Sequence, residues 1–116
     1  MLEAQRAGCA AVRPGAFPAD VDRAARQVLE AAGLGEAFGH GTGHGLGLEV
    51  HEAPRLARPQ PEDAAQPPLE AGVACTIEPG AYVTSRAGIR IEDDVVVTAD
   101  GHERITDVPL GWPTAH

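Results

Sequence analysis

Residues 40–52 read HGTGHGLGLEVHE, and this stretch decides how the rest of the chain is interpreted. It brings His40, His44 and His51 together with glycines at alternate positions from 41 to 47. One interpretation is a loose, glycine-rich turn with incidental histidines. The other is a backbone kept thin so that another group can come close to His44.

The composition indicates one small globular domain. The chain has 116 residues and a formal net charge of −8, which argues against nucleic acid or an anionic membrane as a partner. No stretch approaches the length of a membrane span, and the N-terminal residues lack the order of a signal peptide, so we expect a cytoplasmic protein. Cys9 and Cys75 are too few for a disulfide framework and are expected to be free, buried thiols.

The first third of the chain has the pattern of two helices. Small and apolar residues recur at helical spacing over residues 2–12, so we expect a helix there. A second helix is expected to begin at Pro18, a residue favoured in a first helical turn, and to end at Gly33 or Gly35. The short connection between them predicts an antiparallel pair.

The remainder of the chain has the pattern of strands. The proline-rich residues 53–71 are expected to form a surface loop. Residues 73–83 and 88–98 are rich in β-branched side chains and predict two strands, with a third over 102–106. Two helices followed by an antiparallel sheet make an α+β fold.

Strand alternation puts two carboxylates on candidate functional faces. Side chains alternate between the two faces of a strand, so Glu78 points away from Cys75, and Glu92 points away from the apolar face on which Asp93 is the exception. Each carboxylate alone is interpretable as a solvated charge. With His44 they form a donor set that suits Mn²⁺, Zn²⁺, Co²⁺ or Fe²⁺. The glycines at 41, 43, 45 and 47 are then expected to let backbone and substrate come close to the site, because a metal ion and a peptide need the room.

Competing motifs fail at single positions. A dinucleotide-binding GxGxxG that starts at residue 41 meets Leu46 instead of glycine, and HExxH that starts at residue 51 meets Arg55 instead of histidine. Ser85 is the single serine of the chain and lies in a short turn, without the context of a nucleophile elbow.

Three motifs in order resemble the C-terminal part of the pita-bread metallopeptidases, closest to their Xaa-Pro aminopeptidase and prolidase branch. They are HGTGHGLGLEVHE, TIEPGAYV and GIRIEDDVVVT. The resemblance implies that His44, Glu78 and Glu92 are metal ligands, that Glu78 is also a general base, and that Glu92 bridges two divalent ions. Mn²⁺ or Co²⁺ is the usual metal of the family.

The same resemblance implies roles for three flanking residues. His40 and His51 are similar to histidines that contact the substrate and stabilise the tetrahedral intermediate. Arg90 is similar to an arginine that braces the bridging glutamate. The implied reaction is hydrolysis of the peptide bond before proline, by attack of a metal-activated water on a peptide with proline at P1′.

One departure from the family pattern concerns completeness. The family has two aspartate ligands on a hairpin directly upstream of the first helix of this chain, and neither is present. Residues 1–116 are therefore expected to be a partial catalytic domain, without the N-terminal half, and a truncated fragment of little or no activity. Without the N-terminal half the sheet has unpaired edges, so a homodimer that buries them is an open alternative.

Two alternatives belong to other classes of function. One is a binding or interaction module on a peptidase scaffold, against which the presence of His44, Glu78 and Glu92 counts. The other is an acidic α+β domain with coincidental motifs.

Overall fold

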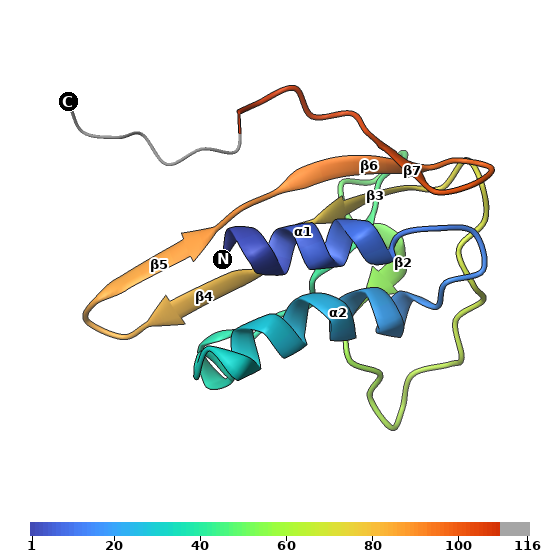
Figure 1. Cartoon of the computed structure of the whole chain (residues 1–116). Helices are drawn as coiled ribbons and strands as arrows, with labels where there is room; N and C mark the ends of the chain where they lie inside the picture. Colours follow the sequence, from blue (N-terminus) through green and yellow to red (C-terminus); the bar gives the residue numbers. More distant parts are fainter. Residues whose placement is uncertain (110–116) are drawn as a thin grey trace.

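The computed structural model describes residues 1–109, so the last part of the expected domain, 110–116, lies outside the described residues. Two helices, α1 (Leu2–Ala11) and α2 (Pro18–Ala31), run in opposite directions and lie together over one face of the strands (Figure 1). A short 3-10 helix, η1 (Gly35–Ala37), follows them. Both predicted helices are confirmed, with ends within a few residues of those expected.

Helix α2 shows why the local pattern of residues was sufficient to predict the helices. Pro18 occupies its first turn, where the missing N–H costs no hydrogen bond. Val21, Ala25 and Leu29 recur every four residues and are at most 1% exposed. This stripe packs α2 against the rest of the molecule and fixes which of its faces looks inward.

The main sheet has five antiparallel strands in the order β2-β1-β3-β6-β7. A two-stranded sheet, β4-β5, extends to one side of it (Figure 1). The strands are β1 (Gly43–Gly45), β2 (Glu52–Leu56), β3 (Ala74–Ile77), β4 (Gly80–Val83), β5 (Ala87–Arg90), β6 (Asp93–Val97) and β7 (His102–Arg104). The predicted α+β class is confirmed.

The two long predicted strands are each broken in the structure. Residues 73–83 divide into β3 and β4 at Glu78 and Pro79, and residues 88–98 divide into β5 and β6 at Ile91 and Glu92. Pro79 has no N–H to donate to a neighbouring strand, so the main ladder ends there. The chain thereby passes from one sheet to the other, and both candidate carboxylates lie at the break.

The prediction of a loop over 53–71 is wrong at its start. Residues 52–56 form β2, an edge strand of the main sheet, and the side chain of Leu56 is 0% exposed. An edge strand tolerates Pro54 because one of its sides needs no partner. The rest of the segment is irregular, and Leu69 anchors it through backbone hydrogen bonds with Gly15 and Ala16.

The core lies between the helices and the main sheet. Its buried residues include Val12, Val21, Leu56, Ile77 and Val95. Cys75 belongs to the same core and Cys9 packs against it, and both are free thiols as predicted. None of the described helices is both long enough and apolar enough to cross a membrane.

Candidate functional site

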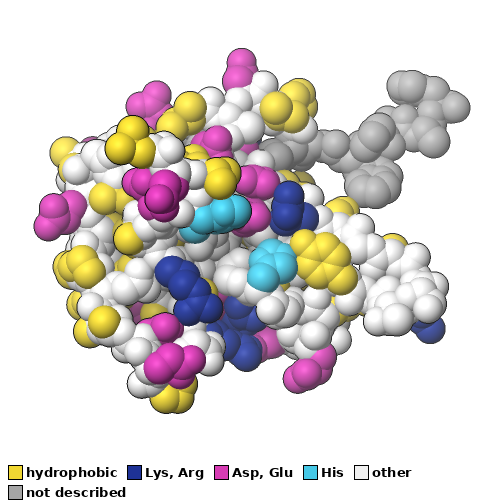
Figure 2. All heavy atoms as spheres, turned by 180° about the vertical axis from the view of Figure 1, so that it is seen from behind, with side chains coloured by type: hydrophobic (Ala, Val, Ile, Leu, Met, Phe, Trp, Pro, Cys, Tyr) yellow, Lys and Arg dark blue, Asp and Glu magenta, His cyan; other side chains and the backbone are white. Residues whose placement is uncertain are grey.

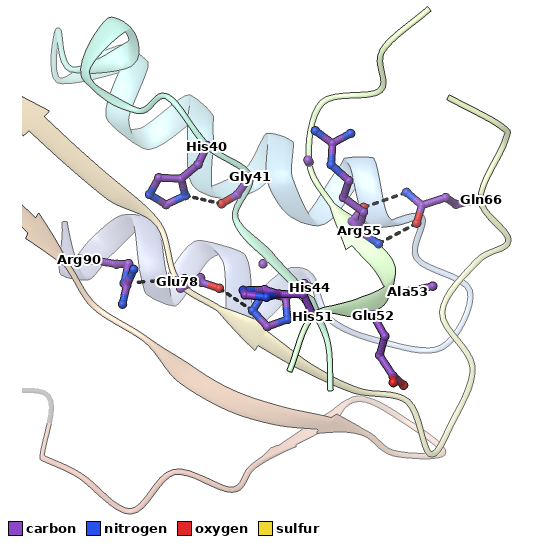
Figure 3. Close-up of a pocket in the computed structure, with 12 residues that line it drawn as sticks. His40, Gly41, His44, His51, Glu52, Ala53, Arg55, Gln66, Glu78 and Arg90 are labelled. Carbon is purple, nitrogen blue, oxygen red and sulfur yellow. Dashed lines mark hydrogen bonds and ion pairs between the residues drawn. The ribbon is translucent and has the colours of Figure 1, made fainter. Parts of the chain in front are cut away.

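A cavity of about 590 Å³ opens on the face of the molecule opposite the helices (Figures 2 and 3). Histidine and arginine side chains gather on this face with acidic groups beside them (Figure 2). Its lining includes five of the six predicted site residues: His40, His44, His51, Glu78 and Arg90. Glu92, the sixth, does not line it. Residues far apart in sequence are thus brought to one place.

The glycines of β1 serve the sheet itself. A Cβ added at Gly43 would overlap the carbonyl group of Thr76 on β3, and one at Gly45 would overlap the carbonyl group of Ala53 on β2. The thin backbone therefore lets two neighbouring strands approach β1 closely. The expectation that these glycines let backbone come close is confirmed at both positions, but the room expected there for a metal ion and a peptide is filled by that backbone.

A β-bulge between β1 and β2 lies next to His44. The β1–β2 register shifts between His44 and Gly45: His44 pairs with Arg55 and Gly45 with Glu52, so Ala53 and Pro54 have no counterpart on β1. Bulges re-orient the side chains beside them and are common next to functional sites. Here the bulge accompanies an imidazole that points into the cavity (Figure 3).

His44 faces Glu78 through Nε2. Its Nδ1 lies 2.9 Å from the carbonyl oxygen of Gly45, which can only accept, so Nδ1 carries a proton. The other ring nitrogen, Nε2, points at Glu78, with Nε2 and Oε1 3.0 Å apart. A proton on Nε2 makes this contact an ion pair; without that proton, two acceptors at this distance repel each other unless a cation lies with them.

Thr76 and Thr42 hold Glu78 and the backbone of His44 in place by hydrogen bonds. The Thr76 hydroxyl donates to Oε1 of Glu78 at 3.0 Å and accepts from the backbone N–H of His44 at 3.1 Å. The backbone N–H of Glu78 donates to the carbonyl oxygen of Thr42 at 2.6 Å. Since Thr76 is 1% exposed and Thr42 is 0% exposed, water does not compete for these bonds. The geometry of His44 and Glu78 is therefore built into the packing of β1 on β3.

The flanking histidines lie on either side of His44. The ring of His51 is 4.4 Å from that of His44, centroid to centroid. His40 donates through Nδ1 to the carbonyl oxygen of Gly41 at 2.8 Å, and its Nε2 forms a hydrogen bond with the hydroxyl of Tyr82 at 3.0 Å. Both rings line the cavity, and their roles toward a substrate stay predictions.

Arg90 links the two carboxylates. Its guanidinium lies 3.7 Å from Oε2 of Glu78 (Figure 3). It also lies 3.5 Å from Oε2 of Glu92. Burial, and then the negative charge of Glu78, raise the pKa of the Glu92 carboxyl, while Arg90 opposes this rise. Arg90 thus lies near both carboxylates, and its bracing role stays a prediction.

The donors fit a divalent metal ion only in part. Among residues 1–109, no group of three or more His, Cys, Asp or Glu side chains is placed to hold a metal ion. His44 and Glu78 do converge, and two ligand atoms bound about 2.1 Å from one ion at a right angle lie about 3 Å apart. Glu92 turns to Arg90 instead, so its role as a ligand stays a prediction.

Sequence reasoning missed several supporting residues. Asp22 and Arg26 form a buried ion pair on α2, and Tyr82 bonds to His40. The spacing of Asp22 and Arg26, four residues apart on a helix, is a signal of pairing but does not show that the pair is buried. No residue near Tyr82 in the sequence indicates its hydrogen bond, because the partner, His40, is 42 residues away.

Two helices on an antiparallel sheet, with His44 on β1 and the two glutamates at strand ends, are the arrangement of the C-terminal part of a pita-bread fold. The model of metallopeptidase family M24 matches residues 1–99, and the chain belongs to this family.

Three relatives illustrate the similarity. The chain is 42% identical to an uncharacterized peptidase, YqhT, of Bacillus subtilis over 109 residues, 94% of this chain and 30% of that protein. It is 41% identical to the Xaa-Pro dipeptidase of Pyrococcus furiosus over 106 residues, 91% of this chain and 29% of that protein. The crystal structure of the dipeptidase PepE from Mycobacterium ulcerans superposes with a TM-score of 0.84 and 51% identity, covering 92% of this chain and 28% of that one. The chain therefore spans less than a third of the length of these relatives.

Proposed function

We propose that this chain is the C-terminal segment of the catalytic domain of a metal-dependent Xaa-Pro peptidase, which hydrolyses the peptide bond before proline. The observation that carries the proposal is that Nε2 of His44 and the carboxylate of Glu78 converge at 3.0 Å inside the cavity. Similarity to peptidases, including an Xaa-Pro dipeptidase, supports the substrate class.

The proposed cofactor is a pair of divalent ions, Mn²⁺ or Co²⁺, held in part by His44, Glu78 and Glu92. Imidazole nitrogen and carboxylate oxygen are suitable donors for such ions. When bound, the metal supplies a nucleophile by lowering the pKa of water. The hydrogen bond from His44 Nδ1 to the Gly45 carbonyl orients the ring for this role, as a fixed tautomer does in metal sites generally.

The remaining roles belong to side chains around the cavity. Glu78 is the general base, since its carboxylate is largely shielded from solvent and accepts a proton next to the substrate. His40 and His51 bind the substrate and stabilise negative charge on the carbonyl oxygen as it is attacked. Arg90 holds the carboxylates of Glu78 and Glu92 in place by its positive charge.

The chain is proposed to be incomplete as an enzyme. Its relatives are more than three times longer, and the two aspartate ligands of the family are not among its residues. Turnover is proposed to require an N-terminal half that supplies them. The two free thiols agree with a cytoplasmic location, which is also proposed here.

Calorimetric titration of the purified chain with Mn²⁺ tests the metal site. We expect binding that is lost in Glu78→Gln and Glu92→Ala and kept in Glu103→Ala, where an exposed glutamate on β7 is removed as a control. Absence of binding to the unaltered chain, or equal binding in all variants, contradicts a preformed half-site. The latter result favours the alternative of a non-catalytic module.

A second assay tests the reaction. The chain is joined to the N-terminal half of a family M24 relative and assayed with an Xaa-Pro dipeptide and, as a control, the matching Xaa-Ala dipeptide. We expect cleavage of the proline substrate only, and only by the joined protein. Cleavage by the pure chain would overturn the proposal that it is incomplete.

A further inference from the structure

A buried ion pair under the candidate site has no part in the roles described so far. Asp22 and Arg26 lie on α2, and their side chains are 1% and 7% exposed. Arg26 donates to both oxygens of Asp22, from Nε at 2.8 Å and from a terminal nitrogen at 2.9 Å. Burying two charges is costly, so a pair in this position needs further hydrogen bonds to be tolerated.

Those further hydrogen bonds all go to one short segment, residues 38–42. Arg26 donates to the carbonyl oxygen of Phe38 at 3.0 Å and to that of His40 at 2.8 Å. Asp22 accepts from the backbone N–H of Thr42 at 3.0 Å and from its hydroxyl at 2.9 Å. The pair therefore holds the segment at three alternate residues. Arg26 binds the carbonyl groups of Phe38 and His40, and Asp22 binds the N–H and hydroxyl groups of Thr42.

The clamped segment leads directly to the candidate site. The guanidinium carbon of Arg26 lies 4.0 Å from the centre of the Phe38 ring, and the edge of that ring meets the imidazole of His40 at 5.2 Å between centroids. At the other end, the carbonyl oxygen of Thr42 accepts from the backbone N–H of Glu78. Both a flanking histidine and the candidate general base are thus one contact away from the clamp.

We propose that the Asp22–Arg26 pair is a positioning device that fixes the backbone of residues 38–42 and thereby sets the imidazole of His40 and the backbone of Glu78 at the cavity. Neither residue lines the part of the cavity that holds His44 and Glu78, so both act through others. The catalytic meaning of this positioning rests on the proposed function; the positioning itself does not.

The test measures amide hydrogen exchange by NMR in the Arg26→Lys chain. Lysine keeps the charge but has three N–H donors on one nitrogen in place of the planar guanidinium, so it cannot make the four hydrogen bonds of Arg26 to both oxygens of Asp22 and to the two carbonyl groups. We expect exchange at the Thr42 and Glu78 amides to accelerate at least tenfold, with a smaller change at Val95 in the core. The nuclear Overhauser contact between the His40 and Tyr82 rings is expected to weaken.

The matched control is Arg23→Lys, on the same helix. Arg23 pairs with Asp20, but their side chains are 61% and 44% exposed, and exchange at Thr42 and Glu78 should stay unchanged. Equal acceleration at the Thr42, Glu78 and Val95 amides in Arg26→Lys overturns the proposal, because the pair would then support only the stability of the whole fold. No acceleration at any of them also overturns it, because the pair would then not hold the segment.

A milder variant covers failure of Arg26→Lys to fold. Thr42→Val removes the hydroxyl bond to Asp22 and leaves both charges paired; it should accelerate exchange at Glu78, and Thr42→Ser should restore the original rate. Failure of both expectations also overturns the proposal. In the joined enzyme, Arg26→Lys should lower kcat/KM at least tenfold; because the exchange measurement needs no turnover, an inactive joined enzyme counts against the proposed function alone.

Discussion

Replacement of Gly43 by alanine should separate β1 from β3. The new Cβ would lie 2.7 Å from the carbonyl carbon of Thr76 and closer still to its oxygen, whereas real Cβ atoms essentially never come within 3.0 Å of other heavy atoms. The obstacle is backbone in the middle of a five-stranded sheet, which cannot turn aside as a flexible side chain can. The two strands must therefore move apart.

The cost follows from what the movement disturbs. Overpacking at a well-filled site costs about 1–3 kcal/mol. The hydrogen bonds from the His44 N–H to Thr76 and from the Glu78 N–H to Thr42 cross this interface, and each contributes about 1 kcal/mol. The free energy of unfolding should fall by about 3–5 kcal/mol, a large share of the roughly 5–15 kcal/mol typical of a domain.

Urea unfolding followed by circular dichroism measures this loss. With a urea dependence of about 1.5–2 kcal/mol per molar, the midpoint of Gly43→Ala should lie about 2 M below that of the unaltered chain. The matched control is Gly39→Ala, four residues earlier in the same segment, where an added Cβ meets no atom within 4 Å. This variant should change the free energy of unfolding by less than about 1 kcal/mol. A Gly43→Ala chain within 1 kcal/mol of the original would refute the explanation of the glycine pattern.

Three further predictions concern the rest of the molecule. Leu56→Ala should lower the free energy of unfolding by about 2–5 kcal/mol in the same urea assay, because this side chain of β2 is fully buried; a loss below 1 kcal/mol would contradict its place in the core. Burial raises the pKa of Cys9 to about 12 and that of Cys75 to about 11. At pH 7.5, iodoacetamide should therefore label both thiols slowly in the native chain and quickly in urea. Mass spectrometry measures the labelled fraction, and equally fast labelling in both conditions would contradict the prediction. Burial also raises the pKa of Asp93, so the folded chain binds its proton more tightly than the unfolded chain. The free energy of unfolding relative to Asp93→Asn should therefore be greater near pH 4 than at pH 7, and a pH-independent difference would count against this.

The helices and the site motifs were accessible from the sequence. The stripe of Val21, Ala25 and Leu29 is a local pattern, and a helix follows wherever such a pattern meets a suitable start such as Pro18. The motifs around His44, Glu78 and Glu92 were recognisable because they stand in a fixed order along the chain. Their convergence on one cavity is confirmed for His44 and Glu78, while their metal-binding roles remain predictions.

The strands were less accessible. Alternation predicted which face each side chain takes, and Val95, Val97 and the exceptional Asp93 are indeed buried together on β6. Pro79 indicated a strand end near Glu78, and β3 does end there, but each long run was predicted as one strand, whereas two sheets share it. The edge strand β2 was missed because proline is a loop signal locally, whereas its position in the sheet makes proline harmless.

By itself, the sequence determined the two helices, the α+β class, the free cysteines and the family motifs, because each depends on residues close together in the chain. Only the tertiary structure decided what fills the space beside the glycines, where the second long strand breaks, and that Asp22 and Arg26 hold the segment of His40. These features are contacts between residues 12 to 42 positions apart or between different strands. Packing in three dimensions selects them, and no local pattern of residue types specifies which backbone or charge will arrive from elsewhere in the chain.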